Sequence, residues 1–442
     1  MCELSDRAIT IFSRLRLNCL SPSEQPTSSA QTDDRMHLRS HQTRNDELYN
    51  AIHTGDAGRC KELLAMGAVN LQEGDYASCP PRDAIKSTLP LQFAVMHRQP
   101  EIVKMLLRHG ADPDWVDIEG KTAVHTLILY WPRCVPKENQ LISQELVMYH
   151  SYLRAVDLIC NDTLRRLCAF GGSPNARDNR QQSPLHYAAR YDIPGAARIL
   201  LSYGAYKDAR DIDRKTPVML AAAMGHCCLE VLLQDNADVH LTCSQGKTAL
   251  HHAVESRCPL HKKEACVRML LRYGTSPNAA DNGGQTPLHA ACRAADESII
   301  TCLLRAGADA DIRDSNGMNS LHVLLDNPNS HPVNTQIVLK LADATLRYGL
   351  PDNGSLPASL NLPGAEVLFQ ALLTDRAPPS LQRICRKVLR TQMIVNSFSS
   401  DAEMKENMTK LPLPKCLQRF LVLDVANPIR QIVLGLQNKI FG

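Results

Sequence analysis

The sequence predicts an all-α chain: a solenoid of about eight helix-turn-helix repeats with finger loops, followed by a small helical module near the C-terminus. Three observations predict it. A four-residue motif recurs at a regular spacing, paired leucines and a glycine close each repeat, and two short apolar patterns follow the last repeat. Because one repeat is too short to bury its own apolar face, the repeats must stack on one another.

The composition limits the classes of function. The net charge of +3 provides no strong field for nucleic acid or an anionic membrane, and a hydrophobic content of 44% is too high for a disordered chain. The 16 cysteines form no CxxC pair and follow no secretory leader, which predicts reduced thiols in an intracellular protein, cytoplasmic and/or nuclear. No apolar run is as long as a membrane helix.

The N-terminal residues 1–44 are predicted to lie outside the repeats. Residues 21–44 are rich in Ser, Gln, Thr and Asp, a composition typical of disorder. Residues 1–20 mix aliphatic side chains with arginines and could form a short amphipathic helix. We therefore interpret residues 1–44 as a disordered N-terminal region.

Residues 45–350 carry the repeats. A motif related to Thr-Pro-Leu-His starts at residues 89, 122, 183, 216, 248, 286 and 319, and most of these starts are 32 or 33 residues apart. A Thr or Ser at the first position can cap a helix through its hydroxyl, and Pro suits the first helical turn. The following Leu and Ala positions form an apolar stripe at helical spacing that can pack on the next repeat.

The end of each repeat is equally regular. The pair Leu200 and Leu201 is followed by Gly204, which can adopt the left-handed conformation that ends a helix. Asn236 occupies this position in another repeat, and Asn tolerates the same conformation. The period and both motifs resemble those of ankyrin repeats, which implies helix pairs joined by finger loops.

Three insertions interrupt the repeats, at residues 69–87, 130–165 and 256–264. The first extends a finger loop, the second contains another helical pattern, and the third lengthens a turn between helices. In solenoids such insertions either shape a binding face or remain neutral solvated loops. Residues 351–377 depart from the repeat and are predicted to form a degenerate capping segment.

Two apolar patterns follow in residues 378–425. Ser380 can cap a helix in which Leu381, Cys385, Val388 and Leu389 share one face. After a polar loop, the element Leu411, Pro412, Leu413 and Pro414 precedes a second short apolar helix. Residues 426–442 form a C-terminal extension with a further apolar pattern.

In their order, spacing and place after the repeats, these patterns resemble the SOCS box of ankyrin repeat and SOCS box proteins. The resemblance implies binding to elongin B/C, with Leu381 entering a pocket of elongin C and Cys385, Val388 and Leu389 on the same face. It also implies that Leu411, Pro412, Leu413 and Pro414 help to select a cullin, by analogy cullin-5 with its RING protein. A purely structural alternative is that Leu381 and Cys385 are the core face of a helix that caps the repeats.

The resemblance therefore implies a substrate-recognition adaptor of a ubiquitin ligase that binds a protein substrate and performs no bond chemistry. The alternative is a non-ligase ankyrin scaffold in which the tail only caps the solenoid. We find no nucleotide-binding loop, nucleophile motif or other catalytic constellation, and the sequence predicts no cofactor.

Two sets of residues remain. The histidines of the motif recur once per repeat, so they form a line rather than a metal site and are predicted to bond to neighbouring loops; scattered Cys and His elsewhere lack the paired spacing of zinc ligands.

Finger loops and first helices usually form the partner surface of such repeats, the concave face. Exposed Trp, Tyr and Arg are enriched among the residues that anchor partners, so the candidates are Trp115, Arg180, Tyr206 and Arg210. Trp115 has an alternative role, packing against the insertion at 69–87.

Overall fold

The computed structural model describes residues 45–66, 71, 89–132, 143–326, 341, 344 and 345, and for residues 143–150 it describes the backbone alone. These residues contain helices, turns and loops, and no strand. Seven helix pairs and the first helix of an eighth follow one another in them, as the repeat pattern predicts. The all-α solenoid is therefore confirmed for this part of the chain.

The pairs follow the sequence period. The first consists of the helical stretch 45–54 and α3 (Ala57–Ala65). The others are α4 (Pro90–Met96) with α5 (Pro100–Arg108), α6 (Ala123–Leu129) with α7 (Ser143–Ala169), α8 (Pro184–Tyr191) with α9 (Pro194–Ser202), α10 (Pro217–Met224) with α11 (Cys228–Gln234), α12 (Ala249–Glu255) with α13 (Leu260–Arg272) and α14 (Pro287–Ala294) with α15 (Glu297–Arg305), and α16 (Ser320–Leu325) opens the eighth.

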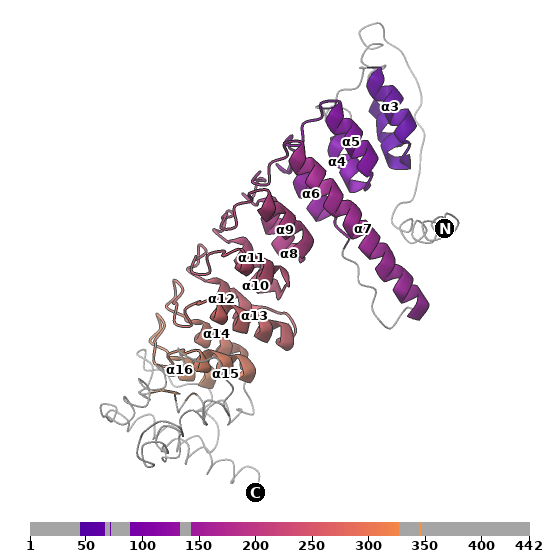
Figure 1. Cartoon of the computed structure of the whole chain (residues 1–442). Coiled ribbons are helices and arrows are strands. Elements are labelled where there is room, and N and C mark those ends of the chain that lie inside the picture. The colour runs from indigo at the N-terminus through magenta and orange to yellow at the C-terminus, as the bar shows by residue number, and fades with distance from the viewer. Residues whose placement is uncertain are drawn as a thin grey trace, which may run out of the picture.

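The helices form two layers along an elongated array (Figure 1). The first helices stack in order from α4 to α16, and the second helices pack beside their neighbours in a parallel row. All substantial helix contacts among the described residues lie within one repeat or between adjacent repeats. Small and aliphatic side chains fill the interface; Leu200, Ala221 and Leu250 are fully buried. This packing explains why 5% aromatic residues suffice.

The motif residues start the first helices as predicted. Ser183, Thr216 and Thr286 have extended backbones and precede α8, α10 and α14, each of which has Pro in its first turn. The residues after the second helices also agree with the prediction. Gly204 has φ +81° and Asn236 has φ +58°, both left-handed.

The second insertion becomes part of a helix. Helix α7 has 27 residues, against nine in α9, and its N-terminal part extends beyond the neighbouring helices (Figure 1). Trp131, at the start of the insertion, is 5% exposed and its Nε1 donates to Asp157 Oδ1 at 2.8 Å. The helical pattern predicted within 130–165 is thus the extended second helix of its repeat.

The third insertion was assigned wrongly in part. We expected residues 256–264 to lengthen a turn, but α13 begins at Leu260 and has 13 residues. Only residues 256–259 form the turn, because the remaining inserted residues continue the helix towards its N-terminus. Several predicted segments lie outside or almost entirely outside the described residues: 1–44, most of 69–87, 351–377, 378–425 and 426–442.

Candidate partner-binding surface

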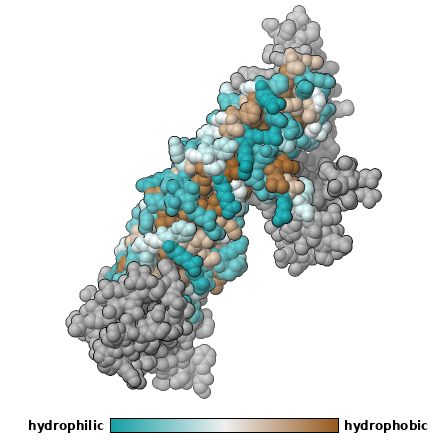
Figure 2. All heavy atoms as spheres, viewed as in Figure 1, coloured by the Kyte–Doolittle hydropathy of each residue, from teal (hydrophilic) through white to brown (hydrophobic). Residues whose placement is uncertain are grey.

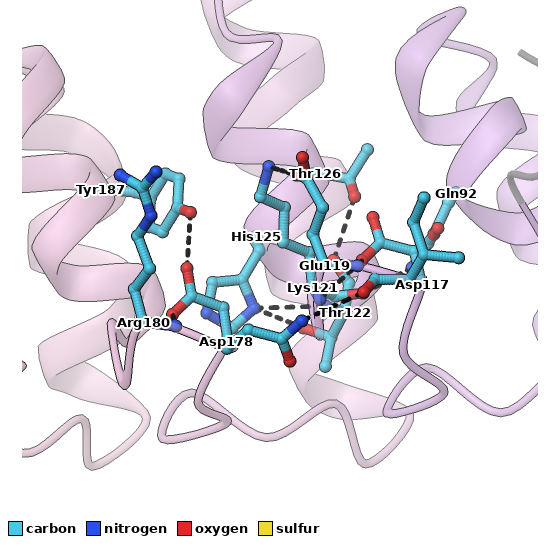
Figure 3. Close-up of polar contacts among 12 residues, drawn as sticks. Gln92, Asp117, Glu119, Lys121, Thr122, His125, Thr126, Asp178, Arg180 and Tyr187 are labelled. Carbon is cyan, nitrogen blue, oxygen red and sulfur yellow. Dashed lines mark hydrogen bonds and ion pairs between the residues drawn. The ribbon is translucent and has the colours of Figure 1, made fainter. Parts of the chain in front are cut away.

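An aspartate organises most of the described finger turns. Asp178 Oδ1 accepts hydrogen bonds from the backbone N–H groups of Arg180 at 2.9 Å and Gln182 at 2.7 Å. Its Oδ2 accepts from the Tyr187 hydroxyl at 2.7 Å, so the carboxylate faces the protein and is buried (Figure 3). Such side-chain-to-backbone bonds fix a tight turn. The same turn is built on Asp117, Asp211, Asp281 and Asp314.

A backbone hydrogen bond joins each of these fingers to the next. The N–H of Asn179 donates to the Glu119 carbonyl at 3.0 Å, and the N–H of Ile212 donates to the Arg180 carbonyl at 3.1 Å. The later links run from Ser244 to Asp213, from Asn282 to Gln245 and from Ser315 to Gly283. The finger tips are therefore held in one row by the main chain.

The histidine row has a structural role, as predicted. His125 Nδ1 accepts from the Thr122 N–H at 3.2 Å, and its Nε2 lies 3.0 Å from the Gln182 carbonyl in the next repeat (Figure 3). This geometry requires the neutral ring with hydrogen on Nε2. Burial lowers the pKa of His125 to about 4. His186, His251 and His289 repeat the pattern with the carbonyls of Lys215, Gln285 and Met318.

The described residues contain no group of three or more His, Cys, Asp and Glu side chains placed to hold a metal ion. The ten cysteines among them are free thiols. Burial raises the pKa of Cys228 to about 12 and that of Cys60 to about 11, so these thiols stay protonated at neutral pH. None of the described helices is both long and apolar enough to cross a membrane.

Trp115 lies on the earliest described finger. It is 42% exposed, and Val116 and Ile118 beside it are exposed as well. Its carbonyl accepts a long hydrogen bond of 3.5 Å from Gln92 Nε2, which ties the finger to α4. This finger presents an apolar tip, as a partner-binding candidate requires. Its alternative role, packing on the insertion at 69–87, involves residues that lie almost entirely outside the described part.

Tyr206 and Arg210 lie together, whereas Trp115 lies two fingers earlier. Tyr206 and Arg210 line an open groove of about 710 Å³ together with Arg177. Tyr206 is 66% exposed, and Arg177 Nη1 donates to the Arg210 carbonyl at 2.6 Å. Arg180 is exposed on the adjoining finger, which the backbone bond from Ile212 joins to the finger of Arg210. Tyr206 and Arg210 thus line one groove, and Arg180 lies on the finger that is joined to theirs. The groove is completed by Ala205, Lys207, Asp208, Ala209 and Asp235.

The tip of each described finger holds a residue with positive φ. Glycine occupies it in four fingers, but Gln181 and Arg214 occupy it in the two adjacent fingers, each with φ +60°. A left-handed backbone costs a residue with a Cβ about 1–2 kcal/mol. We did not predict a left-handed backbone at these two residues from the sequence, although alignment of the six fingers shows where glycine is missing. The glycines are Gly120, Gly246, Gly284 and Gly317.

Most of the viewed face of the repeats is hydrophilic, with small separated hydrophobic spots (Figure 2). This surface suits a partner that is recognised through polar groups and a few apolar anchors. The predicted elongin-binding residues Leu381, Cys385, Val388 and Leu389, and the predicted cullin-binding residues Leu411, Pro412, Leu413 and Pro414, lie outside the described residues.

Family models match both parts of the chain. The model for ankyrin repeats in three copies matches residues 205–281 and 260–347, and the single-repeat model matches 89–118 and 180–212. The SOCS-box model matches residues 377–421. This chain is an ankyrin-repeat and SOCS-box protein. The match begins one residue before the predicted start at 378 and spans both sets of tail residues.

Two relatives are named for the same two parts, ankyrin repeats and a SOCS box. The chain is 26% identical over 386 residues to human ankyrin repeat and SOCS box protein 16, covering 78% of this chain and 76% of that protein. It is 27% identical over 444 residues to the mouse protein of that name, covering 88% of each. The chain is homologous to these proteins. Such an ankyrin-repeat and SOCS-box protein has the architecture of a ubiquitin-ligase substrate adaptor.

A solved structure, the ankyrin repeat domain of Bcl-3, is 24% identical and covers 53% of this chain and 93% of its own, with a TM-score of 0.43. The fold assignment rests on the helix pairs and the repeat matches, not on this likeness. A closer resemblance to ankyrin repeat domain-containing protein 61, suggested by Trp131-Pro132 and Leu356-Pro357, stays a prediction that these comparisons do not test.

Proposed function

We propose that this chain is the substrate-recognition subunit of an elongin B/C–cullin-5 RING ubiquitin ligase and acts inside the cell. The observation that carries the proposal is the SOCS-box match at 377–421, directly after the ankyrin repeats. The chain performs no bond chemistry in this role. It raises the effective concentration of substrate lysines near a charged ubiquitin-conjugating enzyme.

The tail supplies the docking contacts in this proposal. Leu381 and Cys385 are four residues apart, so one helix face presents both to elongin C. Leu381 enters a pocket and Cys385 packs at its edge, while Val388 and Leu389 extend the contact by about one further turn. Pro412 and Pro414 fix the backbone of the element that selects the cullin.

The repeats supply the substrate surface. Their finger tips are held in a row by backbone hydrogen bonds, and the turns behind them by buried carboxylates. A rigid surface loses little conformational entropy on binding. The fingers and first helices therefore support specific recognition of a protein substrate without large rearrangement.

Co-purification with elongins B and C tests the proposal. The full chain should recover both elongins, and the double variant Leu381→Ala with Cys385→Ala should lose at least nine-tenths of them, because two apolar anchors are removed. Arg386→Ala is the matched control, since Arg386 lies on the polar side of the same predicted helix, and it should recover elongins as the wild type does. Equal recovery by the double variant would sink the proposal.

The same experiment separates the adaptor from the non-ligase scaffold. If the tail only caps the solenoid, the wild type recovers no elongins and the double variant unfolds at a lower temperature. The cullin is tested with Pro412→Ala plus Pro414→Ala, which should lose cullin-5 and retain the elongins. Recovery of another cullin in place of cullin-5 would contradict that finer assignment alone.

A further inference from the structure

Two adjacent fingers carry four arginines, Arg177, Arg180, Arg210 and Arg214, which we call the arginine patch. The fingers are joined by the backbone bond from Ile212 to the Arg180 carbonyl at 3.1 Å. Arg177 Nη1 donates to the carbonyls of Gln181 at 3.2 Å and Arg210 at 2.6 Å. This guanidinium therefore has a defined position across both fingers before any partner binds.

None of these four guanidinium groups forms a salt bridge with the residues that the structure describes. The acidic side chains of the same fingers are engaged elsewhere. Asp178 and Asp211 are buried and accept backbone N–H bonds within their own turns. Asp213 pairs with Lys215 at 3.3 Å. The four arginines thus carry charge on these two fingers without an ion-pair partner, and the one acidic side chain there in the same position is Asp208, whose Oδ1 accepts a backbone N–H.

Arg214 stands at a finger position that is left-handed. Its φ of +60° favours glycine, which occupies the same position in four other described fingers. At Gly246, which occupies this position in the next finger, an added Cβ would lie 2.4 Å from Asn282 Oδ1. Glycine is therefore needed at Gly246 because a side chain would clash with the finger that follows. Arg214 therefore adds a charged side chain at a tip position where glycine would carry none.

The groove beside the patch offers room for a bound segment. Its volume is about 710 Å³, and Arg177, Arg210 and the 66% exposed Tyr206 line it. The two acidic side chains in its lining are also engaged: Asp208 Oδ1 accepts the Asp238 N–H at 2.8 Å, and Asp235 Oδ2 lies 4.0 Å from Lys207 Nζ. Tyr206 supplies an amphipathic contact beside the cations.

We propose that the arginine patch and this groove bind an extended, carboxylate-rich segment of a protein partner. Guanidinium groups bind carboxylates through paired, charge-assisted hydrogen bonds, which gives both affinity and direction. The spread of four arginines over two fingers matches several acidic side chains along one extended strand of partner. In the proposed function, this acidic segment belongs to the protein substrate. The binding proposal rests on the proposed function only for what happens to the partner after it binds.

Fluorescence anisotropy with the full chain tests the proposal. The probe is a fluorescein-labelled 12-residue peptide of alternating Glu and Ala, and its counterpart of alternating Gln and Ala is the uncharged reference. The Glu peptide should bind at least tenfold more tightly than the Gln peptide at low salt, and added salt should weaken its binding. Arg214→Gly should weaken Glu-peptide binding at least fivefold while leaving Tm the same or higher.

Gln181→Gly is the matched control, because it relieves the same backbone conformation on the neighbouring finger without removing a charge. It should leave Tm the same or higher and should not weaken peptide binding. Arg180→Gln removes an exposed charge with no change of backbone, and should also weaken the Glu peptide at least threefold.

Equal affinity of Arg214→Gly, Arg180→Gln and wild type for the Glu peptide would overturn the proposal. So would tight, arginine-dependent binding of a 12-nucleotide oligouridine probe without binding of the peptide, which would assign the patch to RNA. The assay contains no elongin or cullin, so its failure is distinguishable from a failure of the proposed function in co-purification.

Discussion

The histidine of each repeat motif links two repeats through one ring. His125 accepts from the backbone that starts its own helix and donates to a carbonyl of the next finger. The sequence predicted a bond to a neighbouring loop but not the bond back to Thr122, because a Thr at a helix start suggests a hydroxyl cap by itself. The ring can serve both partners only while it is neutral.

This geometry predicts acid sensitivity. Because the pKa of His125 is lowered from 6.5 to about 4 in the folded chain, the unfolded chain binds more protons between these values. Its stabilising contribution is complete above pH 6.5 and is lost as the pH falls towards 4. At pH 5 this one ring should lower the free energy of unfolding by about 2 kcal/mol relative to pH 7.5. Urea denaturation at both pH values measures the loss.

His125→Gln is the control for this prediction. An amide can still accept and donate but does not titrate, so the variant should be less stable at pH 7.5 and lose less stability on acidification. An unchanged pH dependence in His125→Gln would show that other groups cause it. Burial also lowers the pKa values of His186, His251 and His289, so part of the pH dependence should remain.

The two tryptophans should differ in how much stability they lose when each is replaced by Phe. Trp131→Phe removes the bond to Asp157 and should cost about 1–2 kcal/mol of stability. Trp115→Phe alters a partly exposed ring and should change stability by less than about 0.5 kcal/mol. Thermal denaturation of both variants checks this, and a larger loss in Trp115→Phe than in Trp131→Phe would contradict it.

At the scale of elements, a finger glycine can provide close packing against the next finger as well as a left-handed backbone. Gly246 has φ +76°, and an added Cβ would lie 2.7 Å from the Asn282 backbone nitrogen in the next finger. Gly246→Ala should therefore cost more than about 2 kcal/mol. Gly110→Ala, at φ +90° with nothing within 4 Å, should cost only about 1 kcal/mol. Urea denaturation of both compares the costs, and equal values would contradict the close approach between fingers.

Helix starts and ends were predictable where one residue type decides them. Asn236 was identified as a left-handed end from the repeat alignment alone, and the structure agrees. The assignment of residues 256–264 to a turn was wrong in part because Leu260 and the residues after it continue the 3.6-residue period of α13, whereas a repeat alignment marks any extra residues as an insertion. The groove at Tyr206 was also not predictable, since it depends on how adjacent repeats are offset in space.

For the whole molecule, the contacts between adjacent repeats determine how far a local loss of stability extends along the array. Because all substantial helix contacts among the described residues stay within adjacent repeats, a local defect should loosen only nearby repeats. In Gly246→Ala, hydrogen exchange should accelerate in α12 to α15 and remain near wild type in α4 to α6. Uniform acceleration along the array, measured by mass spectrometry, would show that it unfolds as one unit.

The order of the two parts was the most predictable property of the molecule. Seven motif starts, together with the order and spacing of the two tail patterns that begin at Leu381 and Leu411, were enough to predict a repeat array followed by a SOCS box, and the family models match both. The roles of those tail residues stay predictions, because their partners are other chains and no pattern within one sequence contains the partner surface.

The hydrogen bonds between fingers have a direction: each one runs from a donor in the later finger to an acceptor in the earlier one. Every repeat in the row thus presents an N–H to the repeat before it and a carbonyl to the repeat after it. A gene duplication or deletion of one whole period would rejoin a donor to an acceptor and leave no bond unmade. A length change within a finger would break the row, whereas an insertion outside the fingers does not: the bond from Asn179 to Glu119 spans the insertion at 130–165. The row of fingers can therefore become longer or shorter in steps of about 33 residues.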